Sequence, residues 1–241
     1  MTTYARRLIT AFLFLVPLAA GATSASSDAL VRSLSEAAPA ANPEVLALAA
    51  HALACVQRSM PARTLSVIDY SLPSTQPRLW VFDLQQPRLL FHELVAHGRN
   101  SGENLASQFS NASGSLKSSL GTFVTDGTYV GHNGYSLRLK GIDGAFNDQA
   151  ESRAIVIHGA SYVSPAFAQT QGRLGRSYGC PAVRQGVARK LIDAISKDSV
   201  VFAYYPDARW LHGSRLLGDC GGDEALSARA SGPSSVKPAG R

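Results

Sequence analysis

The sequence predicts a mainly β fold with a few helices, an α+β arrangement. Short runs of β-type composition recur from Thr64 onwards, and the segments between them contain proline and are typical of turns. Apolar residues at clear helical spacing occur chiefly in two segments, at about 43–59 and 183–196. Strand and helix patterns do not alternate regularly, so a doubly wound parallel sheet is not expected.

The N-terminus has the pattern of a secretory signal peptide over residues 1–25. Arg6 and Arg7 precede an uncharged run from Leu8 to Ala20, and small residues follow it. This run is shorter than the ~20 residues with which a helix crosses a bilayer, which disfavours the alternative of a membrane anchor. Two cleavage points fit, after Ala22 and after Ala25. We expect a periplasmic or secreted protein without stable membrane insertion after cleavage.

Size and charge limit the remaining classes. A chain of 241 residues can bury a full core without metals or many disulfides. The 23 basic and 17 acidic residues give a formal net charge of +6, which falls to +4 when the two arginines of the signal are removed. The acidic residues are spread among the basic ones without a block of like charge, so nucleic acid is not an expected partner.

An Ala-rich helical segment is expected over residues 26–61. Asn42 stands before Pro43 and Glu44 as an N-cap, a first-turn proline and an acidic first turn do, and a helix is predicted at about 43–59. Apolar residues recur along it at helical spacing, so one face of this helix is expected to pack on the body.

The main domain is expected over residues 62–206. The predicted strands are 65–70, 79–84, 89–95, 136–139, 154–158 and 200–205, and a helix is predicted at 183–196. Residues 97–121 form a long stretch rich in Gly, Ser and Asn, and loops of this length are usually functional or mobile. Residues 207–241 read as a C-terminal extension, disordered beyond about 221.

The three cysteines are read against an oxidising compartment, where an unpaired thiol must be buried or employed. We expect Cys55 to pair with Cys220 and Cys180 to remain free, although the sequence alone does not fix the connectivity.

Cys180 and His158 are the candidate catalytic pair. The apolar run 154–157 predicts a buried strand that delivers His158 and Gly159 at its end, and Cys180 lies in a glycine-punctuated loop before a proline and a helix. An imidazole, nearby cations or a helix N-terminus can give a cysteine thiolate character. The expected sources are His158, Arg173 with Arg176, and the helix beginning near Val183.

The N–H groups of Gly179 and Cys180 are the expected oxyanion donors, because a glycine lets the backbone approach a substrate carbonyl closely. Taken alone, however, a Cys and a His at this spacing are more often a buried thiol and a hydrogen-bonded core histidine.

A family resemblance favours catalysis. His158-Gly159-Ala160 and Ser177-Tyr178-Gly179-Cys180 closely resemble the signature of the L,D-transpeptidase (YkuD-like) family, in which a His-Gly strand end precedes an S/T-x-G-C loop. Further phrases, such as Val95-Ala96-His97-Gly98 and Gly134-Tyr135-Ser136-Leu137-Arg138-Leu139, resemble the murein L,D-transpeptidase catalytic-domain subgroup over roughly residues 62–206.

The resemblance implies a β-sandwich that acts on peptidoglycan stem peptides without a metal or other cofactor. Cys180 would attack the carbonyl at the L-centre of diaminopimelate, expel the terminal D-Ala and form a thioester. His158 would act as the base, oriented by a backbone carbonyl as is often so in this family. Transfer of the acyl group to an amine would cross-link the wall, and transfer to water would trim the stem.

The chain departs from the family pattern around the nucleophile. Tyr178 replaces a common His before Gly-Cys, and Ala182 replaces a common Arg or Asn after it. The remaining candidates for substrate binding are Arg176, which we favour for the stem-peptide carboxylates, with Arg173, Arg184, Ser177, Tyr178 and Gly159. One or two of these arginines are equally explained as solvated side chains.

Three alternatives follow from these departures and from the shared chemistry. The same machinery would serve an L,D-carboxypeptidase or an amidase that detaches wall-linked protein, and the alternative of another class is a non-catalytic peptidoglycan-binding module. A zinc site at His92 and His97 is not expected, because these histidines are five residues apart instead of four.

Overall fold

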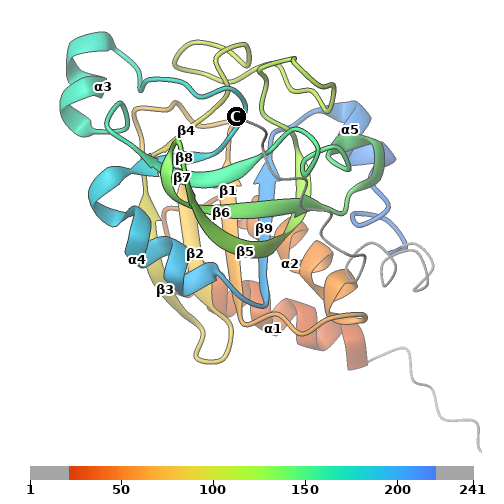
Figure 1. The fold of residues 1–241 in the computed structure, drawn as a ribbon. Coiled ribbons are helices and arrows are strands. Elements are labelled where there is room, and N and C mark those ends of the chain that lie inside the picture. Colours follow the sequence, from red (N-terminus) through yellow and green to blue (C-terminus); the bar gives the residue numbers. More distant parts are fainter. Residues whose placement is uncertain (1–21, 221–241) are drawn as a thin grey trace, which may run out of the picture.

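The computed structural model describes residues 22–220 and forms a single curved sheet flanked by helices (Figure 1). Its strands are β1 (Thr64–Asp69), β2 (Leu79–Asp83), β3 (Arg88–Glu93), β4 (Val95–Ala96), β5 (Gly121–Gly131), β6 (Gly134–Gly141), β7 (Val156–Ala160), β8 (Ala182–Arg184) and β9 (Ser199–Tyr204). The helices are α1 (Ala22–Ala37), α2 (Pro43–Gln57), α3 (Pro165–Gln171), α4 (Gln185–Ile195) and α5 (Ala208–Gly213). The mainly β class with a few helices is therefore confirmed.

The sheet closes upon itself through one bent segment. The strand order is β3-β2-β1-β9-β5-β6-β7-β8-β4, so the two outermost strands are consecutive in the chain and only Leu94 separates them. The segment pairs with β2 before Leu94 and with β8 after it. A strand that changes partners at a bend is how the two layers of a β-sandwich are joined at a corner.

The predicted N-terminal helix is present as α2. The Asn42 side chain accepts a hydrogen bond from the Glu44 N–H at 2.9 Å, and Pro43 occupies the first turn, as the sequence indicates. Its buried face packs on β1 and β9, and α1 packs beside it and against β3 (Figure 1). Both helices belong to the same hydrophobic core as the sheet, with Leu34 and Leu53 fully buried.

The sequence analysis did not predict two of the strands, β5 and β8, or two of the helices, α3 and α5. Only the first four residues of β5 are fully buried, so its outer half lacks the apolar alternation on which strand prediction depends. Strand β8 has three residues and runs directly into α4, which merges the two patterns into one predicted helix.

Strand β7 begins two residues later than predicted. Ala154 adopts a left-handed conformation with φ of 54°, and the Ile155 N–H donates to the Ala150 carbonyl at 2.9 Å instead of joining the ladder. The first two residues of the apolar run 154–157 therefore belong to a turn, and the strand begins at Val156. His158 and Gly159 consequently lie inside the strand, which ends at Ala160.

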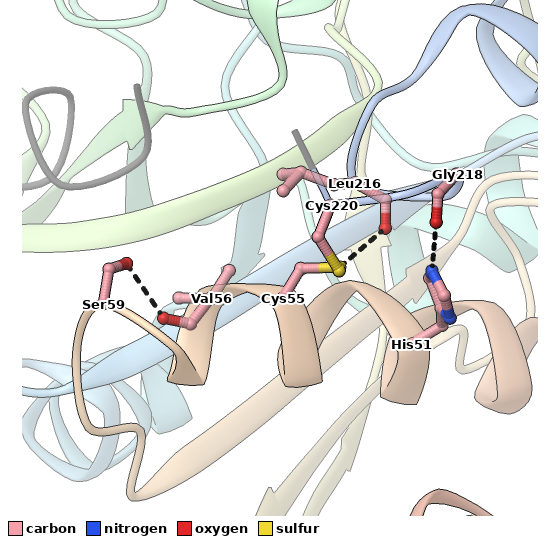
Figure 2. Close-up of a disulfide and its surroundings, with 7 residues drawn as sticks. All are labelled: His51, Cys55, Val56, Ser59, Leu216, Gly218 and Cys220. Carbon is pink, nitrogen blue, oxygen red and sulfur yellow. Dashed lines mark hydrogen bonds between the residues drawn. A yellow bond between two sulfur atoms is a disulfide. The ribbon is translucent and has the colours of Figure 1, made fainter. Parts of the chain in front are cut away.

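A disulfide fixes the C-terminal extension to α2. Cys55 is fully buried on α2 and bonds to Cys220 with a Cα–Cα distance of 5.1 Å, and Figure 2 shows the bond beneath the 216–220 segment. The expected pairing is confirmed, and Cys180 is free. The extension is further held by buried Trp210, whose indole N–H donates to Asp143 at 3.0 Å.

The expected signal peptide and the expected disordered tail lie largely or wholly outside the described residues. Within residues 22–220, none of the helices combines the length and apolar character needed to span a bilayer.

Candidate active site

The Cys180 thiol lies on the loop that enters β8, against the start of β7. Its Sγ accepts a hydrogen bond from the Val156 N–H at 3.4 Å, and the S–H group donates to the Ala154 carbonyl at 3.6 Å. The residue is half-buried. The turn that delays β7 therefore presents both an amide and a carbonyl to the sulfur.

His158 lies on the strand beside this loop. Strands β7 and β8 are parallel, and His158 pairs with Ala182, two residues after Cys180. Since the thiol is bound at Val156, two residues before His158, about 7 Å of strand separates the two positions. The two candidate residues are thus brought together from 22 positions apart in the chain.

A backbone carbonyl holds the imidazole. His158 is 4% exposed, and its Nδ1 lies 3.0 Å from the carbonyl of Gly159. A carbonyl can only accept, so Nδ1 carries the proton and Nε2 has the free lone pair. Gly159 itself lies under α4, where an added Cβ would come 2.8 Å from that of Ala188, so this glycine permits close packing of the helix.

Burial keeps both members of the pair neutral near pH 7. Desolvation raises the pKa of the Cys180 thiol, opposed by the Val156 N–H and the charge of Arg153. Desolvation also lowers the pKa of His158, opposed by its bond to Gly159. Burial therefore favours a neutral thiol beside a neutral base and opposes the thiolate character expected from the sequence.

Two expected sources of thiolate character act elsewhere. Helix α4 begins at Gln185, beyond the end of β8, whereas Cys180 precedes that strand, and the influence of a helix N-terminus fades within one turn. Arg173 and Arg176 both form ion pairs with Glu103, at 2.8 and 2.7 Å. One carboxylate is therefore shared between two guanidinium groups and offsets one of their two positive charges.

Arg184, the remaining candidate arginine, is paired with a carboxylate. It forms two hydrogen bonds of 2.7 Å with Glu93.

One of the two expected oxyanion donors is already hydrogen-bonded within the loop. The Gly179 N–H donates to the Ser177 hydroxyl at 3.0 Å, and that hydroxyl donates to the Cys180 carbonyl at 2.6 Å. Ser177 therefore braces the loop, and the Cys180 N–H is left as the candidate oxyanion donor.

Gly179 is required where three backbone segments cross. Its φ is 127°, and an added Cβ would lie 2.9 Å from the Lys117 carbonyl. Gly98 lies at the same crossing. A Cβ added to Gly98 would lie 2.9 Å from the Gly179 Cα and 2.5 Å from the Leu116 carbonyl oxygen. The long segment 97–121 thus passes directly behind the nucleophile.

Tyr178 marks the open side of the site. Its side chain is 69% exposed, and the Arg99 guanidinium lies 5.1 Å from its ring centroid. Desolvation, together with the nearby charges of Cys180 and Tyr178, raises the pKa of Tyr162 to about 12. Two tyrosines thus stand near the thiol, one of them facing solvent.

Arg153 was missed by the sequence analysis. Its guanidinium donates to Ser110, Ser115, Lys117 and Ser119 on the long segment, at 2.5–3.3 Å. An added Cβ on Gly179 would be 3.2 Å from its Nη2, so it abuts the nucleophile loop. A single basic residue before a predicted strand carries no pattern that could have revealed this.

The described histidines show no metal centre. His92 stacks on Trp80, and His97 is buried against Arg78, so the two rings lie in different surroundings. Within residues 22–220, the one close group of potential ligands is His51 with Cys55 and Cys220. Both sulfurs of that group are consumed by the disulfide, and His51 binds the Gly218 carbonyl (Figure 2).

Comparison with known proteins adds a family match. A family model described as the L,D-transpeptidase catalytic domain matches residues 37–204. The search of the curated proteins found no match.

Solved structures with similar folds include three L,D-transpeptidases. One from Mycobacterium smegmatis has 15% identity and a TM-score of 0.37, covering 60% of this chain and 59% of that protein. L,D-transpeptidase 3 from Mycobacterium tuberculosis has 15% identity and a TM-score of 0.35, covering 59% and 61%. One from Stackebrandtia nassauensis has 12% identity and a TM-score of 0.35, covering 74% and 90%. The match thus spans about three fifths of the first two proteins.

Proposed function

Because the chain belongs to the L,D-transpeptidase catalytic-domain family, we propose that it is an exported cysteine acyltransferase acting on peptidoglycan stem peptides. Family membership supports peptidoglycan-related transpeptidase activity. The carrying observation for this chain is the register of β7 and β8, which sets His158 opposite Ala182 and so beside the Cys180 loop.

The first half-reaction forms a thioester. His158 Nε2 accepts the thiol proton as Sγ attacks the carbonyl at the L-centre of diaminopimelate. The Cys180 N–H donates to the oxygen that becomes negative in the tetrahedral intermediate. When the carbon–nitrogen bond breaks, the imidazolium returns its proton to the departing D-Ala amine, and the acyl group remains on sulfur.

The second half-reaction resolves the thioester. His158 removes a proton from an acceptor amine as its nitrogen attacks the acyl carbon, and the carbon–sulfur bond breaks. The sulfur then receives the proton from the imidazolium. An amine acceptor yields a cross-link, and water yields a shortened stem.

Burial has a mechanistic consequence here. A buried neutral thiol is a weak nucleophile, so proton removal by His158 must accompany attack instead of preceding it. A neutral imidazole at working pH suits that role, and the lowered pKa of His158 keeps it neutral.

Substrate contacts and export complete the proposal. Tyr178, Arg173, Arg176, Ser177 and Gly159 are proposed to surround the stem peptide, and the exposed Tyr178 ring supports this for its own position. Export is supported by the N-terminal pattern of residues 1–25, and the Cys55–Cys220 disulfide is of the kind that persists in oxidising compartments.

The test is incubation of the purified protein with disaccharide-tetrapeptide, followed by mass analysis of the products. Cross-linked dimers that lack one D-Ala are the expected result. Cys180→Ala and His158→Ala should abolish them while the variants keep their thermal unfolding transition. Ser152→Ala, which alters an exposed residue near the site, is the matched control and should retain activity.

Other products would decide against transfer. Tripeptide without dimer would identify an L,D-carboxypeptidase. Release of wall-linked protein from a separate conjugate substrate would identify an amidase. If neither substrate is altered and the Cys180→Ala variant binds peptidoglycan as the wild type does, the protein is a non-catalytic binding module.

A further inference from the structure

Arg153 holds a positive charge beside the nucleophile that no described carboxylate offsets. Its hydrogen-bond acceptors are the carbonyls of Ser110 and Lys117 and the hydroxyls of Ser115 and Ser119. All four acceptors are neutral, so they fix the guanidinium in place without cancelling its charge.

The other cations near the loop are placed differently. Arg173 and Arg176 share the Glu103 carboxylate, which cancels one of their two positive charges. The Lys117 ammonium also has a neutral acceptor, the Gln108 amide, but it extends to the exposed surface, where water and salt screen it more strongly than a charge in a half-buried site.

The backbone geometry places this charge beside the nucleophile loop. Arg153 immediately precedes Ala154, whose left-handed backbone turns its carbonyl to the Cys180 S–H group. The guanidinium itself lies beside Gly179, the residue before Cys180, and a Cβ added to Gly179 would be 3.2 Å from Nη2 of Arg153. Arg153 therefore flanks the nucleophile through both neighbouring segments.

We propose that Arg153 is a positioning residue that favours the ionised form of Cys180 and fixes the 110–119 segment behind it. The inference rests on the proposed role of Cys180 as the nucleophile and deepens it. A substituted side chain at position 153 would leave the buried sulfur to ionise against desolvation with only the Val156 N–H to support it.

The remaining titratable groups facing the thiol do not supply positive charge near pH 7. His158 on β7 is kept neutral by burial, which lowers its pKa. Burial raises the pKa of Tyr70 after β1 and of Tyr162 after β7 to about 12, so both phenols are neutral near pH 7. Tyr178 on the same loop is a phenol, and Arg99, whose guanidinium lies 5.1 Å from the Tyr178 ring centroid, is exposed, so Arg153 is the half-buried cation beside the nucleophile loop.

The test is the pH dependence of Cys180 alkylation by iodoacetamide, followed by mass spectrometry on the full-length protein without substrate. Arg153→Gln should move the midpoint upward by about one pH unit and slow alkylation about tenfold at a pH below both midpoints. Arg153→Lys keeps the charge and should retain most of the wild-type midpoint. Arg88→Gln removes an exposed arginine that is paired with Asp83 at the start of β3 and should leave the midpoint unchanged.

Two further variants separate charge from anchoring. Ser115→Ala and Ser119→Ala each remove one acceptor while the charge stays, so their midpoints should match the wild type. The proposal is overturned if Arg153→Gln keeps the wild-type midpoint, or if the serine variants shift it as far as Arg153→Gln does. If Arg153→Gln does not fold, a midpoint in Arg153→Lys that rises by a full unit overturns it.

The failure of the two proposals is distinguishable. Alkylation requires no stem peptide, so a shifted midpoint with no turnover of disaccharide-tetrapeptide would preserve the role of Arg153 and refute the transpeptidase. An unshifted midpoint with normal turnover would refute the role of Arg153 and preserve the transpeptidase.

Discussion

Arg78 donates a hydrogen bond from Nη2 to Nδ1 of His97 over 2.8 Å, although both side chains are buried. The same guanidinium also binds the carbonyls of Val95 and Leu72, and it lies 5.1 Å from the Tyr70 ring centroid. His97 in turn accepts the Ser177 N–H at its carbonyl, over 3.0 Å. A buried neutral histidine thus supports the nucleophile loop from behind.

The first prediction concerns stability in acid. Burial and the charge of Arg78 lower the pKa of His97 from 6.5 to about 4. Between these values the unfolded chain binds a proton that the folded protein refuses, so this stabilisation is complete above pH 6.5 and is lost as the pH falls toward 4. The loss amounts to roughly 3 kcal/mol.

Urea unfolding at pH 7 and pH 4 would measure this loss of unfolding free energy. His97→Gln retains an acceptor for Arg78 but does not titrate. Between pH 7 and pH 4 the variant should therefore lose up to about 3 kcal/mol less than the wild type loses. Parallel losses in the two proteins would refute the role assigned to His97.

The second prediction concerns the reactivity of the thiol. Since burial raises the pKa of Cys180, the wild-type alkylation rate should keep climbing above the ordinary thiol pKa of about 8.5. A preformed thiolate–imidazolium pair would instead give a plateau that extends below pH 7. A stopped-flow titration with iodoacetamide from pH 5 to 10 distinguishes them, with Cys180→Ala as the blank.

The third prediction concerns the backbone crossing behind the site. In Gly98→Ala the new Cβ would meet the Leu116 carbonyl and the Gly179 Cα, so the backbone must move. We expect a loss of about 1–3 kcal/mol in unfolding free energy and a large loss of turnover. Gly186→Ala is the matched control, because its Cβ would meet nothing within 4 Å and alanine favours a helix. Equal stabilities for the two variants would contradict the crossing.

The fourth prediction concerns the disulfide. Cys55 and Cys220 are 165 residues apart, and cross-linking so long a loop strongly restricts the unfolded chain. The double variant Cys55→Ala/Cys220→Ala should lose about 2–5 kcal/mol in urea unfolding. Reductant should destabilise the wild type and Cys180→Ala alike, and it should leave the double variant unaffected. A reductant effect in the double variant would refute this origin.

Part of the site could be predicted because its residues are marked locally. The apolar run before His158 and the glycines around Cys180 are visible in the sequence, and so is the cap at Asn42. The Cys55–Cys220 pairing also agrees with expectation, although the sequence left it open.

The rest depends on contacts between distant segments. Arg153 donates hydrogen bonds to residues about 40 positions earlier in the chain, and the sequence around Arg153 does not indicate that these acceptors are neutral. The Ser177 hydroxyl captures the Gly179 N–H because the loop folds back on itself, a geometry that a Gly-Cys motif does not specify. Burial of the thiol likewise follows from packing by several elements, and it opposes the thiolate character expected from the sequence.

The bend at Leu94 has one more consequence. Exposed edge strands invite pairing with other chains and so promote aggregation. Here the two strands at the ends of the sheet order are halves of one segment, each already paired along one side, and β4 contributes two residues. Of the two free edges of the described sheet, the one on β4 is therefore too short to act as a template, and intermolecular β-pairing would be confined to the six residues of β3.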